Sequence, residues 1–307
     1  MAACVIGASV GLSASSDGRI RGRVIDRTGS AHPLAHQTVR LTIVERGASS
    51  DQEAVSDAAG WFQFTGLPVG GIRVFVLTTE YRGARYASDR VVLAAAAPVQ
   101  VVDLIVYESS SDQAAVRGTL ALAVVDVARG AVRVSVVQGL SNPTDETVVV
   151  DPQDPLVFPL PPGAEAVSTL AGWRDPHIAA GRITDAFPLP PGVAQVAYTY
   201  GVEAKHSTLG LPWSLPYGAK DVEVLVADVG VNAAVDGLTA QGTVTGPKGR
   251  YRRYSGGPLL PGGRIVLRIR GMPLAGDPWP LAVAGGLGMT LALGLALALR
   301  RSRRVAV

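Results

Sequence analysis

The feature that most constrains this chain lies near its C-terminus, where residues 281–299 form a run of nineteen residues without a charged side chain. With a helical rise of about 1.5 Å per residue, such a run is roughly 28 Å long, close to the hydrocarbon thickness of a bilayer. Trp279 precedes the run, where an aromatic ring favours the membrane interface. Four arginines follow the run at once: Arg300, Arg301, Arg303 and Arg304. The sequence therefore predicts a single transmembrane helix over 281–299 and a basic cytoplasmic tail over 300–307, with all preceding residues outside the cytoplasm.

The first seventeen residues form an apolar leader of small side chains, similar to the end of a signal peptide but without a basic segment before it. An alternative interpretation is that Cys4 is a lipidation cysteine behind a truncated leader. Both interpretations predict export to the cell surface or the periplasm of a bacterial envelope. Cys4 is also the single cysteine of the chain, which excludes an intrachain disulfide and a cysteine-based zinc cluster.

The charge balance argues against a nucleic-acid partner. The chain has 28 Lys and Arg residues and 25 Asp and Glu residues, and four of the arginines lie in the predicted tail. The remainder is near neutral, with no clustered basic stripe of the kind that nucleic-acid binding needs. The 36 glycines and 21 prolines, among many β-branched residues, predict strands joined by tight turns and hence an all-β fold.

Short alternating segments separated by turn clusters predict a β-sandwich over residues 18–110. The expected strands are 19–26, 38–45, 61–64, 72–79, 85–93 and 100–107. Within them, GRVIDRTGSAHPLAHQTVRL and VSDAAGWFQFTGLPVGGIRVFV resemble the carboxypeptidase regulatory-like domains, which have a transthyretin-like, carbohydrate-binding-like fold. The resemblance implies a non-catalytic module that supports binding, and some relatives with a similar sandwich bind carbohydrate.

Trp61 is the first candidate binding residue. It lies out of phase with Phe62 and Phe64, so its ring is expected to face outward and to contact a sugar ring or a protein partner. The alternative is that the second domain or a neighbouring loop covers it.

A second, Ig-like β-sandwich is predicted over residues 111–275. Its expected strands are 117–127, 131–138, 147–150, 193–202, 222–227, 238–245 and 264–270. The hexapeptide FPLPPG occurs at 158–163 and again at 187–192, which suggests two equivalent strand-to-loop corners. Trp173 and Trp213 are predicted in proline-rich loops, either as binding residues or as plugs at one end of the sandwich. The run RYRRY at 250–254 is predicted to be a solvated edge strand.

The sequence patterns that match motifs for catalysis or metal binding lack the structural context that those motifs need. The G-x-S-x-G pattern at 7–11 lies in the leader, without the strand and helix that a nucleophile elbow needs. His32 and His36 have metal-ligand spacing, but Pro33 disfavours a helix at His32. We therefore predict no catalytic residues, no metal site and no cofactor.

The sequence favours a non-catalytic, single-pass membrane protein whose two β-sandwiches form a binding or scaffold surface outside the cytoplasm. Its expected partners are the membrane and an envelope or membrane protein. One alternative is carbohydrate or cell-wall binding through exposed Trp61, Trp173 or Trp213. Another is an unfamiliar hydrolase that uses His177 with Asp175 or Asp185.

Overall fold

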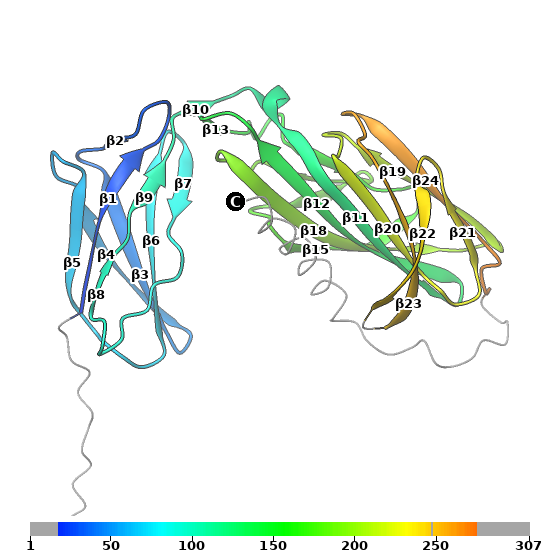
Figure 1. Ribbon diagram of the computed structural model, residues 1–307, viewed down its shortest axis with the longest axis horizontal. Helices are drawn as coiled ribbons and strands as arrows, with labels where there is room; N and C mark the ends of the chain where they lie inside the picture. The colour runs from blue at the N-terminus through cyan, green and yellow to red at the C-terminus, as the bar shows by residue number, and fades with distance from the viewer. Residues whose placement is uncertain (1–17, 247, 275–307) are drawn as a thin grey trace, which may run out of the picture. The chain divides into compact units, whose positions relative to one another are not determined.

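The computed structural model describes residues 18–246 and 248–274, and these residues are almost entirely β-structure. The one regular helix among them is a 3-10 turn, Gln113–Ala115. The chain divides into two compact units between Ser109 and Ser110 (Figure 1). The prediction of an all-β chain built from several sheets is thus confirmed at this level.

No helix in the described ranges is long and apolar enough to cross a membrane. The predicted leader at 1–17, the transmembrane helix at 281–299 with Trp279, and the tail at 300–307 with its four arginines lie outside the described residues.

The first unit consists of two sheets. In one, β1 pairs antiparallel with β2 and β5 and parallel with β8 and β9. The other has the antiparallel order β4-β3-β6-β7. The strands are β1 (Gly18–Asp26), β2 (His32–Pro33), β3 (Thr38–Glu45), β4 (Ala48–Val55), β5 (Trp61–Leu67), β6 (Arg73–Tyr81), β7 (Ala84–Ala87), β8 (Val99–Val101) and β9 (Leu104–Val106).

Period-two alternation places one face of each sheet in the core of the first unit. Ile20 and Val24 of β1 are fully buried, as are Leu41 of β3 and Phe75 of β6, while the residues between Ile20 and Val24 on the other face of β1 remain at least partly exposed. Phe62 and Phe64 of β5 join this core with an edge-to-face ring contact at 6.1 Å. The alternation in the sequence therefore locates this core correctly.

The first unit departs from the predicted strands in three places. The edge strand β4 occupies a segment that reads as a turn, because its residues are nearly all exposed and carry no alternating apolar pattern. The segment 85–93 forms a strand only as far as Ala87. The segment 100–107 splits into β8 and β9, which lie on consecutive stretches of β1.

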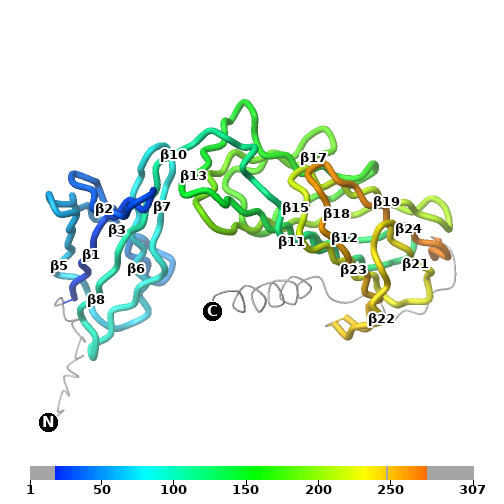
Figure 2. Tube along the Cα trace, turned by 45° about the horizontal axis from the view of Figure 1, so that its top comes forward, coloured from blue at the N-terminus to red at the C-terminus, as the bar shows by residue number. Residues whose placement is uncertain are grey.

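The second unit is built on a seven-stranded sheet with the order β15-β18-β12-β11-β20-β23-β22 (Figure 1). Figure 2 follows the chain of this unit from β11 to β24 in a second view. Neighbouring strands are antiparallel except for β11 and β20, which are parallel. The strands are β11 (Arg117–Ala128), β12 (Ala131–Asn142), β15 (Ala164–Ala171), β18 (Gly192–Glu203), β20 (Asp221–Ala227), β22 (Thr239–Gly246) and β23 (Gly249–Gly256).

Two three-stranded sheets, β14-β17-β16 and β19-β24-β21, supply the other side of the second core. A short two-stranded ladder joins β10 to β13. The remaining strands are β10 (Ser109–Ser110), β13 (Thr147–Val148), β14 (Leu156–Pro159), β16 (His177–Ala179), β17 (Arg182–Asp185), β19 (Thr208–Leu215), β21 (Asn232–Val235) and β24 (Gly263–Arg270).

The two FPLPPG hexapeptides occupy equivalent corners, as their repetition predicts. The first leads from β14 to β15, and the second leads from β17 to β18. Since β14 pairs with β17 and β15 pairs with β18, each hexapeptide carries the chain from the small sheet to the large one. The rigid proline pairs and the positive φ of Gly163 and Gly192 fit this change of layer.

Two expectations for the second unit are wrong. The run at 250–254 lies in β23 between β20 and β22, so it is not an edge strand, and its Tyr251 and Tyr254 are buried. Trp213 lies in the regular strand β19 rather than in a loop. Its two flanking prolines suggested a loop, yet Pro212 pairs with Val266 of β24 at a position that the ladder tolerates.

Candidate arginine–tryptophan face

Three arginines line the outer face of β1 in the first unit. Arg19, Arg21 and Arg23 alternate with the core residues Ile20 and Gly22, so all three side chains project from the same side of the strand. Alternate residues of a strand are about 6.6–6.8 Å apart, which sets the spacing of the three cationic side chains at their roots. Together with Trp61 of β5 they form what we call the arginine–tryptophan face.

Trp61 is half-buried and lies against two of these arginines. Its Cα is the direct cross-strand partner of Arg23, and the Arg23 guanidinium carbon lies 4.3 Å from the centre of the Trp61 ring. The guanidinium carbon of Arg21 lies 5.9 Å from the same ring. Both distances fall within the range of cation–π attraction. Trp61 therefore faces outward as the sequence predicts, but its ring holds guanidinium groups in place.

Adjacent strands widen this face on both sides of β1. Val99 and Val101 of β8 are the parallel partners of Arg19 and Arg21, and they are 49% and 57% exposed. On β5, exposed Gln63 is the partner of Arg21. The face thus carries a row of cations with an apolar row on one side and an aromatic and amide row on the other.

The arginines of this face have no anionic partner among the described residues. None of the three guanidinium groups forms an ion pair or a hydrogen bond there, and the Arg23 Nε is buried without an acceptor. By contrast, Arg40 and Arg73 on the other sheet pair with Glu53 at 2.9 Å and Glu45 at 2.7 Å. Three like charges in a row repel one another, so an anion that binds across them relieves this repulsion.

Asp103 is the carboxylate in direct contact with the backbone of this face, and its role is structural. It accepts a hydrogen bond from the backbone N–H of Arg23 at 2.8 Å, where the chain passes from β8 to β9. The bond links β1 to the chain between two short strands, and it engages the backbone of Arg23 rather than its guanidinium group.

A buried polar cluster lies at the far end of β1. Asp26 is fully buried and accepts a hydrogen bond from the backbone N–H of Thr28 at 2.8 Å. The hydroxyl of Tyr81 lies 2.5 Å from Glu108 Oε1 and 3.1 Å from Asp26 Oδ2. Burial, and then the contact with Glu108, raises the pKa of Tyr81 to about 12. This cluster joins the ends of β1 and β6 to the chain after β9, which is a structural role.

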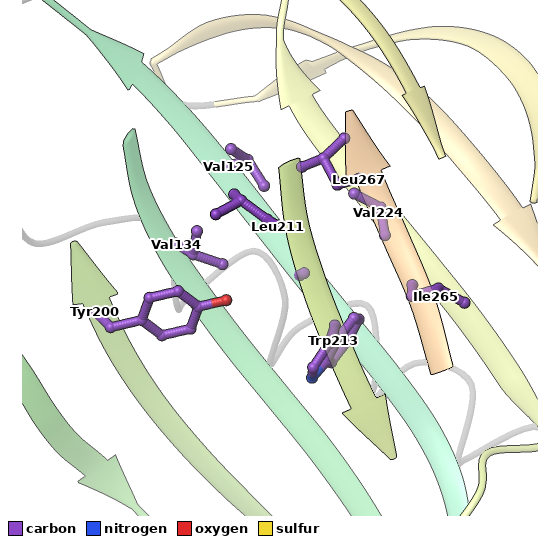
Figure 3. Close-up of a pocket in the computed structure, with 9 residues that line it drawn as sticks. Val125, Val134, Tyr200, Leu211, Trp213, Val224, Ile265 and Leu267 are labelled. Atoms are coloured by element: carbon purple, nitrogen blue, oxygen red, sulfur yellow. The ribbon is translucent and has the colours of Figure 1, made fainter. Parts of the chain in front are cut away.

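The other two candidate tryptophans are packed into the second unit. Trp173 donates a hydrogen bond from Nε1 to the carbonyl of Ala197 at 2.7 Å, and its ring contacts Phe158 and Tyr198 edge-to-face. Trp213 is only 6% exposed and lines an apolar pocket with Tyr200, Leu211 and other core side chains (Figure 3). The expectation that Trp213 is exposed is therefore wrong, because β19 turns its ring into the core.

The residues of the hydrolase alternative do not form a catalytic arrangement with one another. Asp185 is buried, and its carboxylate accepts hydrogen bonds from the backbone N–H groups of Arg174 at 2.8 Å and Asp175 at 3.2 Å. His177 is exposed and pairs across the ladder with Thr184, so its side chain lies on the face opposite to Asp185. No group of three or more His, Cys, Asp or Glu side chains within the described ranges is placed to hold a metal ion.

Trp61 was predicted from the sequence, whereas the arginines beside it were not. The signal was present in GRIRGRVID, where Arg19, Arg21 and Arg23 alternate with glycine and isoleucine at the start of β1. The net charge of the whole chain conceals this pattern, because the acidic residues that balance these arginines lie elsewhere in the sequence.

Comparison with known protein families finds a match for the first unit. Residues 19–106 match the family of carboxypeptidase regulatory-like domains, which confirms the resemblance drawn from the sequence. The match does not extend into the second unit. No curated protein matches the chain.

Two solved structures are similar to parts of the chain. A candidate carbohydrate-binding protein from Pseudomonas aeruginosa is 15% identical, covers 30% of this chain and 90% of its own, and has a TM-score of 0.22. An M1 zinc metallopeptidase from Deinococcus radiodurans, bound to a Tyr-Ser-Ala substrate, is 12% identical with a TM-score of 0.35. That match covers 51% of this chain and 43% of the metallopeptidase. At these TM-scores neither similarity bears on function.

Proposed function

We propose that this protein is a non-catalytic, single-pass membrane protein whose two β-sandwich units bind an envelope partner outside the cytoplasm. The observation that carries the binding role is the arginine–tryptophan face, a row of guanidinium groups without counter-ions within the described residues. The match of the first unit to carboxypeptidase regulatory-like domains supports the same role, because that resemblance implies a non-catalytic module that supports binding. The apolar run at 281–299 and the arginines after it carry the membrane part of the proposal.

The membrane part is tested by ending the chain after Leu274. The full-length protein, expressed in a bacterial host, is expected in the membrane fraction and to resist a carbonate wash, because an apolar helix of this length inserts effectively irreversibly. The shortened chain is expected in the soluble fraction with its two sandwiches folded. Recovery of the full-length protein in the soluble fraction contradicts the proposal.

The orientation is tested separately on spheroplasts. Added protease is expected to digest both sandwich units while a C-terminal epitope tag stays intact, because the arginines after residue 299 keep the tail in the cytoplasm. Digestion of the tag together with protection of the two units contradicts the orientation. Crosslinking followed by affinity purification from detergent-solubilised membranes then identifies the partner.

Carbohydrate binding is the second candidate function, and one observation favours it over the hydrolase alternative. Trp61 is partly exposed on a sheet face that also presents Gln63, an amide of the kind that binds sugar hydroxyls. Trp213 is not available to a sugar, because its ring is buried in the core of the second unit, and Trp173 packs against the same core.

A further inference from the structure

We infer that the arginine–tryptophan face binds an extended acidic segment of a partner protein, with carboxylates at alternate residues lying along β1. This inference rests on the proposed binding function and names the chemistry of the partner. The identity of the occupant follows from three features of the face: its positive charge, the spacing of the arginines along β1, and the contact between Trp61 and Arg23.

The charge favours an anionic occupant. Arg19, Arg21 and Arg23 stand side by side on one face of β1 without an ion pair among the described residues, whereas other described arginines that lack an ion pair, such as Arg46 and Arg90, do not form such a row. Guanidinium groups bind carboxylates bidentately and are hydrated more weakly than ammonium groups, so they suit such an interface.

The repeat distance favours a peptide. Same-face residues of β1 recur about every 6.6–6.8 Å, and an extended polypeptide repeats its same-face side chains at this same distance. Acidic residues at positions i, i+2 and i+4 of an extended segment therefore meet Arg19, Arg21 and Arg23 in register. A polymer of single sugar rings, or a lipid headgroup surface, has no repeat that is fixed to this distance.

The contact between Trp61 and Arg23 favours binding of an anion over stacking of a sugar on the Trp61 ring. Arg23 lies over the Trp61 ring at 4.3 Å, so a sugar that stacks there must first displace the guanidinium. The same contact limits the motion of Arg23 and reduces the conformational entropy that binding costs.

The test measures binding of fluorescein-labelled peptides to the full-length protein in a non-ionic detergent, by fluorescence anisotropy at low and at moderate salt. One peptide alternates Glu and Thr over twelve residues. The other has the same composition as Glu-Glu-Thr-Thr repeated three times, so that no two of its Glu residues stand two positions apart and it cannot meet neighbouring arginines of β1 in register. The alternating peptide is expected to bind at least about threefold more tightly, and the affinity is expected to fall as salt screens the charges.

The decisive variant replaces all three arginines, R19Q/R21Q/R23Q. It is expected to weaken binding of the alternating peptide about tenfold or more, given the usual strength of exposed ion pairs. The matched control R46Q/R85Q/R90Q removes the same charge from exposed arginines elsewhere in the first unit and is expected to bind like the unchanged protein. If the triple variant unfolds, the single variant Arg21→Gln, at a solvent-exposed position, replaces it with an expected loss of about twofold to fivefold.

Each of three results overturns the inference. These are equal binding of the two peptides, equal loss in the two triple variants, and tighter binding of polygalacturonate that depends on the same three arginines. The last result identifies an acidic glycan as the occupant. The peptide assay uses purified protein, so a negative result there does not contradict the proposed membrane location. A negative fractionation result, in turn, does not contradict peptide binding by the arginine–tryptophan face.

Discussion

Replacing Gly22 with alanine is expected to destabilise the first unit strongly and to leave the stability of the second unit unchanged. Gly22 is buried in β1 where the chain between β8 and β9 crosses close to the strand. A Cβ atom at Gly22 lies 1.8 Å from the carbonyl oxygen of Val102 and 2.9 Å from the Phe62 ring. A backbone atom cannot rotate away as a side chain can, so β1 and Val102 must separate.

That separation breaks two hydrogen bonds that hold the sheet together, from Val102 N–H to the Arg21 carbonyl at 2.8 Å and from Arg23 N–H to Asp103 at 2.8 Å. The expected loss in the free energy of unfolding is about 3 kcal/mol or more, at the upper end for overpacked sites. Scanning calorimetry of the full-length protein in detergent measures it, since the two units have separate cores and are expected to give two transitions.

Gly210→Ala is the control for this substitution. Gly210 lies in β19 of the second unit, and a Cβ atom there meets nothing within 4 Å. This variant is expected to leave both transitions within a few degrees of those of the unchanged protein. A first transition in Gly22→Ala that matches the unchanged protein contradicts the steric argument.

The sequence predicts the parts of this fold that follow from alternation. β1 and β3 of the first unit and β24 of the second begin and end within one residue of the predicted segments, because apolar and polar positions alternate through them. β11 and β20 match their predicted segments equally well, although they are apolar runs with residues buried on both faces. The carboxypeptidase regulatory-like resemblance locates the first unit because that module has a distinctive turn and aromatic strand.

Alternation fails where tertiary contacts replace it. β4 is exposed on both faces as an edge strand, so nothing in its side chains indicates pairing with β3. β23 looks like a solvated edge, yet Tyr254 turns into the core, where its hydroxyl donates to the Ala233 carbonyl at 2.6 Å. A buried tyrosine hydroxyl needs a hydrogen-bond acceptor, and here the acceptor comes from a different strand. The sequence around Tyr254 does not show that this acceptor is present.

The candidate site was predicted in part for the same reason. Trp61 was found from its phase, because strand geometry alone decides on which face a side chain lies. The contact of Trp61 with Arg23 depends on the register of β5 against β1, and these two strands are separated along the chain by β2, β3 and β4. Trp213 was misplaced because prolines normally mark loops, whereas here β19 keeps its full ladder with β24.

The second unit is expected to unfold cooperatively between pH 10 and pH 12. Burial raises the pKa of Tyr217 to about 12, although the hydrogen bond that its hydroxyl accepts from Val157 N–H acts in the opposite direction. Burial also raises the pKa of Tyr198 and Tyr200, whose rings stack at 6.3 Å in the core. Each folded-state pKa exceeds the value near 10 that an unfolded tyrosine has.

This difference in pKa determines the direction in which stability changes with pH. Stability from the neutral phenols is fully present below pH 10 and is lost as the pH rises through the folded-state values. Tyr217 alone accounts for about 2 kcal/mol over this window, from a shift of two pH units at roughly 1.4 kcal/mol each, reduced for its partial exposure. Tyrosinate absorbance and circular dichroism are expected to change together, and titration near pH 10 with the sheets intact contradicts this.

Two phenylalanine variants separate ionisation from hydrogen bonding. Tyr200→Phe removes an ionisable group for which no hydrogen bond is seen among the described residues, so it is expected to change stability little at pH 7 and to move alkaline unfolding to higher pH. Tyr217→Phe leaves the Val157 N–H without its acceptor and is expected to cost about 1–2 kcal/mol at pH 7. Its free energy of unfolding should nevertheless fall less steeply above pH 10, because one neutral phenol that must ionise is gone. If the free energy of unfolding falls equally steeply above pH 10 in the unchanged protein and in both variants, these buried tyrosines do not cause the alkaline transition.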